Sequence, residues 1–107
     1  MRDEKEVFET FSDLHPDTLQ VWIDRGWLVP KRSRNGYRFR EIDVARIRLI
    51  QEFRNELEID EEALDLILPL LDQVHGLRQE LRRLADAVNA QPDDIRERIL
   101  STLAEND

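Results

Sequence analysis

Cysteine is absent from the 107 residues, which excludes disulfides, thiolate metal sites and cysteine nucleophiles. Only three glycines and four prolines occur, too few for a turn-rich sheet protein, so a mostly α-helical fold is expected. No eighteen apolar residues run together, and the amino-terminal MRDEKEVFETF lacks the apolar core of a secretory signal. These absences favour a cytoplasmic protein with one modest core and no membrane segment.

Charge is plentiful but unevenly placed along the chain, whose formal net charge is −8. Residues 1–57 carry 11 basic and 11 acidic side chains, whereas residues 58–107 carry 5 basic and 13 acidic ones. Within the first part, residues 25–54 hold nine basic side chains against three acidic ones. A local basic patch therefore precedes an acidic carboxyl-terminal half.

A helix is predicted to start at His15-Pro16-Asp17, because proline suits the first helical position and aspartate suits the positive end of the helix dipole. Gly26 marks its end. In the following WLVPKRSRNGYRF, Asn35-Gly36 is a two-residue hairpin signal. It predicts a β-hairpin with one strand from Leu28 to Lys31 and the other from Tyr37 to Phe39.

An amphipathic helix is predicted from residue 43 to residue 57, and a longer one from Asp60 onward. Along the long helix, apolar residues alternate steps of four and three, which is typical of a coiled coil or an antiparallel helix pair. They start at Ala63 and Ile67 and continue as the seam Leu70, Val74, Leu77, Leu81, Leu84 and Val88. The seam predicts a homodimer if it packs on a second copy, and a folded-back monomer if it packs on the head or on the last helix.

Pro69 and Gly76 interrupt the long helix, and proline removes a backbone donor, so a kink or a break is expected at Pro69. A short helix follows from residue 93 to residue 104. The chain then divides into residues 1–58 and residues 59–107. Four aromatic residues at helical or core spacing are expected in the core, and Tyr37 is expected to be exposed; the four are Trp22, Trp27, Phe39 and Phe53.

The order of a helix-turn-helix at HPDTLQVWIDRGWL, a hairpin with NGYR and a helix with DVARIRLI resembles the winged helix-turn-helix of MerR-type regulators. The run ELEIDEEALDLILPLLDQVHGLRQELRRLADAV after it is similar to the chaperone-modulator CbpM family. That second resemblance covers roughly residues 5–89. It implies a protein that binds the J-domain of a DnaJ-like (CbpA-type) co-chaperone and inhibits its work with Hsp70. Association with the nucleoid through that partner is left open.

The MerR resemblance implies the alternative function, a DNA-binding transcription regulator. MerR-type recognition helices read like LRYYERLGLL, and the equal-length stretch here is LQVWIDRGWL. Gln20 and Asp24 stand where that pattern has arginines, so two phosphate-attracting charges are lost. The candidate nucleic-acid contacts are Gln20, Arg32, Arg34, Tyr37 and Arg38. The basic hairpin residues could instead be solvated or paired with the chain's own acidic half.

The acidic start of the long helix has two interpretations as well. Carboxylates there stabilise the helix dipole and keep the chain soluble. They could also steer the basic helix of a J-domain, and the candidate partner-binding residues are Glu61, Glu62, Asp65 and Asp72. Catalytic and metal-binding constellations are missing from the sequence, so neither an enzyme nor a cofactor is predicted.

Overall fold

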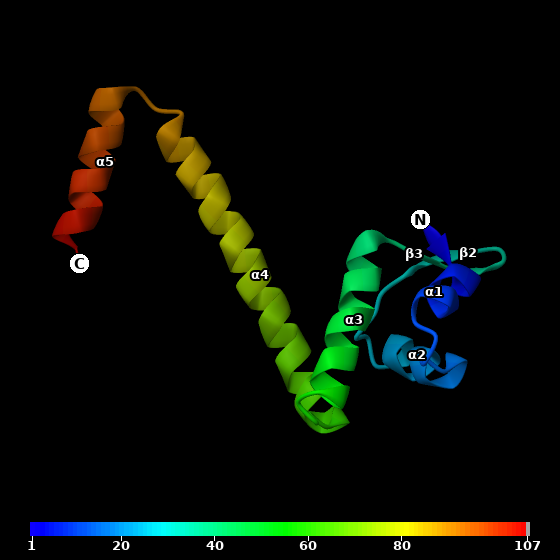
Figure 1. Cartoon of the computed structure of the whole chain (residues 1–107). Helices are drawn as coiled ribbons and strands as arrows, with labels where there is room; N and C mark the ends of the chain where they lie inside the picture. Colours follow the sequence, from blue (N-terminus) through cyan, green and yellow to red (C-terminus); the bar gives the residue numbers. More distant parts are fainter. Residues whose placement is uncertain (107) are drawn as a thin grey trace. The chain divides into compact units, whose positions relative to one another are not determined.

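The computed structural model describes residues 1–106, which form two compact units (Figure 1). The first unit, called the head below, is Met1–Leu68, and the second begins at Pro69. The predicted boundary after residue 58 lies inside the head. This is because the long helix starts within it, where Leu64 and Leu68 are buried.

The helix-turn-helix consists of α1 (Glu4–Thr10) and α2 (Pro16–Asp24). The carboxylate of Asp3 accepts a hydrogen bond from the Glu6 amide at 2.9 Å and so caps α1. The ring Nδ1 of His15 accepts one from the Asp17 amide at 3.2 Å and caps α2. The sequence pattern predicted a helix start at this tripeptide, but not this capping hydrogen bond. Both helices were expected within residues 15–28, but α1 precedes that stretch, and Trp27 and Leu28 form a buried loop.

The wing is a three-stranded antiparallel sheet in the order β1-β3-β2. Its strands are β1 (Arg2–Asp3), β2 (Lys31–Ser33) and β3 (Gly36–Phe39). The prediction of a strand from Leu28 to Lys31 was wrong, since pairing begins only at Lys31. The turn is also one residue earlier than predicted, because Ser33 pairs with Gly36 and Arg34 and Asn35 form the loop. Gly36 itself takes the left-handed φ of +118°.

The core of the head gathers apolar side chains from all its helices and from the central strand. The helix α3 (Glu41–Asn55) supplies Val44, Ile47 and Ile50 to it. At its amino terminus, the Asp43 carboxylate accepts the Arg40 amide at 2.8 Å. The other buried apolar residues are Val7, Phe11, Leu14, Leu19, Trp22, Trp27, Leu28, Phe39, Leu64 and Leu68. Phe53, predicted to belong to this core, is half-buried, and so is Tyr37, predicted to be exposed.

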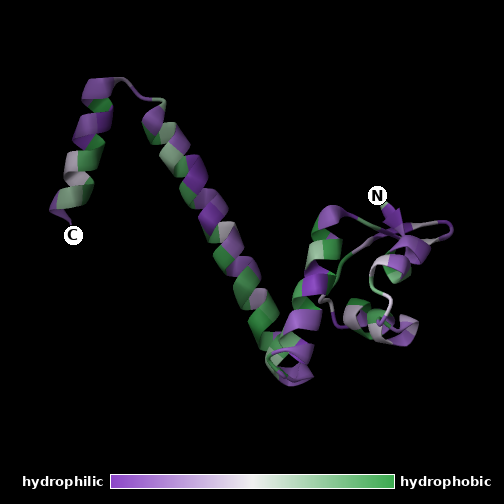
Figure 2. Cartoon of the chain, viewed as in Figure 1, coloured by the Kyte–Doolittle hydropathy of each residue, from purple (hydrophilic) through white to green (hydrophobic). Residues whose placement is uncertain are grey.

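The long helix α4 (Glu61–Asn89) runs through Pro69 without the break that was one of the two expected outcomes. Asp60 caps its start, since the Asp60 carboxylate accepts the Ala63 amide at 2.8 Å. The last helix is α5 (Asp93–Glu105). Figure 2 shows hydrophobic residues recurring along α4 between hydrophilic ones. In the described residues from Pro69 onward, however, no hydrophobic side chain is buried.

Candidate nucleic-acid and protein interfaces

The outer face of α2 occupies the position of a recognition helix, and it has no cation. Leu19 and Trp22 are buried on its inner side. Asp17, Gln20 and Asp24 are exposed on the other side, together with Val21. The Gln20 amide donates a hydrogen bond to the Asp24 carboxylate at 2.9 Å, which occupies the candidate base-reading group. The helix therefore presents two carboxylates and a tethered amide to solvent.

The basic residues of the wing are placed differently from those of α2. Lys31, Arg32, Arg34 and Arg38 are exposed, and within residues 1–106 none of the four forms an ion pair. They are therefore solvated, and pairing with the chain's own acidic half is not observed. The Arg32 guanidinium lies over the Tyr37 ring at 5.9 Å, a cation–π contact that orders both candidate residues.

Arg40 belongs to the same sequence run but serves the fold. Its guanidinium hydrogen bonds to the buried Asp43 carboxylate at 3.2 Å and to the Val29 carbonyl at 3.1 Å. The hydrogen bond to Asp43, followed by the attraction of its charge, raises the pKa of Arg40 above the ordinary value. Arg40 therefore holds the wing to α3 rather than extending from it.

The predicted acidic cluster is divided by the structure. Asp65 accepts hydrogen bonds from Arg25 at 2.8 Å and from the Trp27 indole at 2.6 Å. Glu61 pairs with the same arginine at 3.0 Å. We call these four residues the Arg25 clamp; they attach the start of α4 to the end of α2. Glu62 is exposed beside the clamp, and Asp72 lies further along α4, in the second unit.

The clamp was not predicted from the sequence, because Arg25 and Asp65 lie 40 positions apart. The Arg25 guanidinium also lies 5.4 Å from the centre of the Trp27 ring. The only available signal was a basic residue at the helix end, which a helix dipole already explains. The structure thus gives Glu61 and Asp65 a role within the head, before any partner is considered.

Replacing Asp65 with alanine tests the clamp. The change leaves the part-buried Trp27 indole without an acceptor and removes a charge from Arg25, so the free energy of unfolding should fall by about 1–3 kcal/mol. Urea titration followed by tryptophan fluorescence measures it. Glu62→Ala is the matched control on the same turn. Its free energy of unfolding should lie within roughly 0.5 kcal/mol of the wild-type value. Equal effects of the two variants would contradict the clamp.

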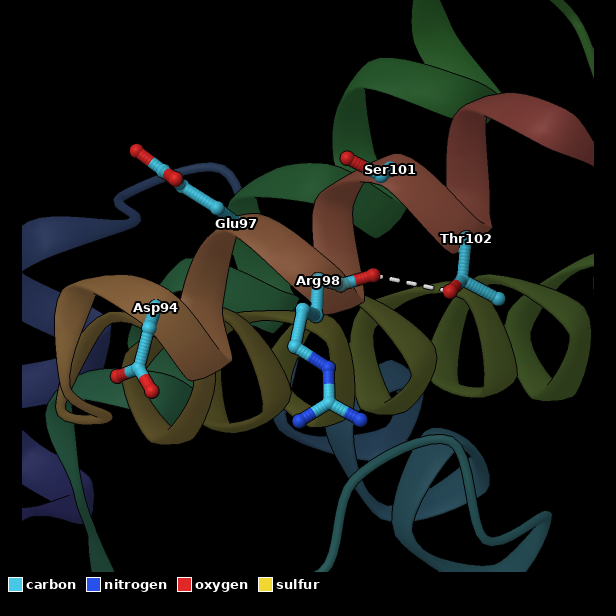
Figure 3. Close-up of a pocket in the computed structure, with 5 residues that line it drawn as sticks. All are labelled: Asp94, Glu97, Arg98, Ser101 and Thr102. Atoms are coloured by element: carbon cyan, nitrogen blue, oxygen red, sulfur yellow. Dashed lines mark hydrogen bonds between the residues drawn. The ribbon is translucent and has the colours of Figure 1, made fainter.

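A hollow on α5 is a further candidate site, and Figure 3 shows the residues that line it. All five lining residues come from this one helix: Asp94, Glu97, Arg98, Ser101 and Thr102. The Thr102 hydroxyl donates to the Arg98 carbonyl, as Ser and Thr hydroxyls do within helices. Within residues 1–106, no group of three His, Asp or Glu side chains is placed to hold a metal ion. No helix described is long and apolar enough to cross a membrane.

A family model described as MerR HTH family regulatory protein matches residues 5–86, from α1 to the last turns of α4. The chain belongs to this family. No curated protein and no solved structure matches it significantly. The family description is of regulatory proteins rather than of enzymes, and it covers both the winged helix-turn-helix and most of α4. The predicted MerR-like fold is thereby confirmed; the narrower resemblance to chaperone modulators remains a hypothesis.

Proposed function

We propose that this MerR-family protein is a protein-binding regulator that captures the J-domain of a DnaJ-like (CbpA-type) co-chaperone in the cytoplasm and inhibits its work with Hsp70. The observation that carries the proposal is the anionic outer face of α2. Asp17 and Asp24 are exposed there, and Arg25, the residue that follows Asp24, is held by Glu61 and Asp65.

Electrostatics argue against α2 as a reader of duplex DNA. A helix in the major groove lies between two rows of phosphates, and each lysine or arginine facing them releases counterions and adds affinity. Two carboxylates in that place repel the phosphates instead. The same carboxylates attract a basic helix, and complementary potential speeds association and fixes orientation. The resemblance to chaperone modulators names such a basic helix, that of a J-domain.

The candidate partner-binding set is changed by the Arg25 clamp. Glu61 and Asp65 already neutralise Arg25, so their charges contribute less to a partner. Glu62 is exposed next to them, and no ion pair of its carboxylate is seen within residues 1–106. We therefore assign J-domain recognition within the head to Asp17, Asp24 and Glu62, with Glu61 and Asp65 as positioning residues. Asp72, in the second unit, remains a candidate for a separate contact.

The second candidate function is DNA binding, and the free cations of the wing favour it. Lys31, Arg32, Arg34 and Arg38 are exposed and form no ion pair within residues 1–106, and they lie close together on two adjacent strands and the loop that joins them. Wing strands of this kind contact phosphates without reading sequence. The two functions therefore predict different binding faces on one small head: α2 for a J-domain, the wing for a duplex.

A crossed pair of charge reversals separates these functions. Asp17→Lys with Asp24→Lys should weaken J-domain binding at least about tenfold, since close charge pairs couple by about 1.5 kcal/mol or more. Lys31→Glu with Arg34→Glu on the wing should leave the affinity for the J-domain unchanged. Calorimetric titration of the purified J-domain at two salt concentrations measures both. The wild-type affinity should fall as the salt concentration rises.

The same two variants are then titrated against a random-sequence duplex pool and against the DNA upstream of the chain's own gene. Under the proposal, the wild type binds neither DNA tightly at physiological salt. A sequence-selective complex that the wing reversal abolishes, together with no heat from the J-domain, would establish the DNA-binding function instead. Both binding measurements use the full chain, and a separate urea titration of each variant, followed by tryptophan fluorescence, would reveal a folding defect.

A further inference from the structure

The asparagine at the tip of the wing does not hold the turn together. Asn35 follows Arg34 in the loop and is exposed. Its φ is not positive, since Glu58 is the one residue other than glycine with a positive φ in the part of the chain that the structure describes. Its side-chain amide forms no hydrogen bond within residues 1–106. We propose that Asn35 is a site of spontaneous deamidation, at which the wing loses ammonia and gains a negative charge as the protein ages.

Gly36 supplies the backbone nitrogen that attacks the Asn35 side chain. A side chain on the residue after an asparagine hinders this approach, and glycine has none. The turn in turn requires glycine here, because a φ of +118° is one that residues with a side chain rarely adopt. A Cβ added at Gly36 would also lie only 3.0 Å from Oε2 of Glu4. The fold therefore keeps, directly after a reactive amide, the residue that hinders the reaction least.

The reaction needs no reactant other than water. The Gly36 nitrogen bonds to Cγ of Asn35 and gives up its proton, while the bond from Cγ to the side-chain nitrogen breaks and ammonia leaves with that proton. A cyclic imide results. Water then adds to one of its carbonyls: opening at Cγ gives aspartate, and opening at the main-chain carbonyl carbon gives isoaspartate, in which the main chain passes through the side chain. Either product has a carboxylate where a neutral amide stood.

The charges of the wing favour the attack on Asn35. The attacking nitrogen loses its proton as it reacts, so positive charge nearby stabilises the negative charge that develops. The carboxylate of Glu4 next to Gly36 acts in the opposite direction, but it is outnumbered. Four exposed cations lie in the loop and on the strands beside it: Lys31, Arg32, Arg34 and Arg38. The carboxylate formed then lowers the positive charge of the wing, whichever partner the head binds.

Two other asparagines provide an internal comparison. Asn55 and Asn89 are also exposed, and they are the last residues of α3 and α4. The residues after them, Glu56 and Ala90, carry side chains. The backbone nitrogens of both also donate helical hydrogen bonds, each 3.0 Å from a carbonyl oxygen one turn earlier. A nitrogen held in this way is not available for attack, so both asparagines should persist where Asn35 reacts.

Peptide mapping of the aged full chain tests the site. The purified protein is kept for weeks in warm, slightly alkaline buffer, and samples from the start and the end are digested with trypsin. Cleavage after Arg34 and Arg38 releases residues 35–38, NGYR, which report on Asn35 alone. Most of this peptide should gain the mass that replacing an amide NH2 by OH adds, and should separate into aspartate and isoaspartate forms. The peptides with Asn55 and Asn89 should keep their masses.

Asn35→Gln should stay a single charge species on an anion exchanger, because glutamine closes the larger ring much less readily, and it should keep the wild-type urea midpoint. Asn89→Gln is the matched control and should age like the wild type. Lys31→Gln with Arg32→Gln should slow conversion about twofold to fivefold, as the loss of surface charge pairs does. An unchanged rate in that variant would contradict the role of the wing charges. An NGYR peptide that keeps its mass, or equal conversion at Asn35 and Asn89, would overturn the site itself.

Discussion

If the α4 seam packs on a second copy, which is one of the two arrangements that the sequence predicts, replacing Leu77 and Leu81 with aspartate is expected to give single chains while the head stays folded. Each side chain is 64% exposed in one chain, so the carboxylates replacing them are solvated there and do not disturb it. In a pair, the same carboxylates would be buried against apolar neighbours without a cation. One unpaired buried charge costs about 3–5 kcal/mol, and two changes per chain should weaken association by at least about a thousandfold.

Sedimentation measures the loss of association, and tryptophan fluorescence measures the head. Trp22 and Trp27 are both buried in the head, so their unfolding transition should keep its midpoint in the variant. Circular dichroism should show a loss of helix, because residues 69–89 would have no packing partner and a lone helix of that length is marginal in water. Gln79→Asp is the outward-facing control. Unchanged mass and unchanged helicity in the double variant would show that nothing covers the seam.

The helix boundaries were predictable from the sequence where a capping residue marks them. His15 and Pro16 start α2, Asp60 caps α4, and Gly26 follows the end of α2 with a φ of +77°. These signals are local, because a side chain hydrogen bonds to a backbone group two or three residues away. The carboxyl end of α3 has no such residue. There, Glu58 takes the left-handed φ of +52° that glycine usually supplies, and the predicted end at residue 57 was two residues late.

The outgoing strand of the wing was misplaced for a reason that also lies in the residues. Leu28 and Pro30 are apolar, as strand residues often are, but both are buried in the head within a loop. Pairing with β3 begins at Lys31, whose neighbours on β2 are all exposed and polar. Polar exposed strands have no hydrophobic alternation, and alternation is the signal by which a strand is recognised. The position of the turn was predicted more accurately: the loop lies one residue before the predicted Asn35-Gly36.

The candidate sites were predictable only in part, because their geometry depends on contacts between distant residues. The sequence indicated that α2 had lost two positive charges, and the structure confirms that its outer face has none. It did not indicate that Arg25 binds Glu61 and Asp65, which requires α4 to start beside the end of α2. An acidic run next to a basic helix end is compatible with many pairings, and the fold selects one of them. The wing cations, conversely, remain unpaired.

Replacing Phe39 with alanine is expected to have the largest effect on the head. Its side chain is 0% exposed, on the central strand of the wing, and its ring centre lies 6.4 Å from that of Tyr37. Truncating a buried phenylalanine costs about 3–5 kcal/mol, a large part of the 5–15 kcal/mol that holds a typical domain together. Urea titration followed by tryptophan fluorescence should show this loss. Tyr37→Ala, on the same strand but half-buried, should lose less.

The Phe39 variant complements the aspartate variant of the seam, because each acts on a different unit. Phe39 lies in the unit that ends at Leu68, and Leu77 and Leu81 lie in the other. If the pair is formed by α4 alone, Phe39→Ala lowers the stability of the head and, below its unfolding midpoint, leaves the sedimenting mass unchanged. A variant that lost both together would show that the heads take part in the pair. The wing and α4 would then be one interface rather than two.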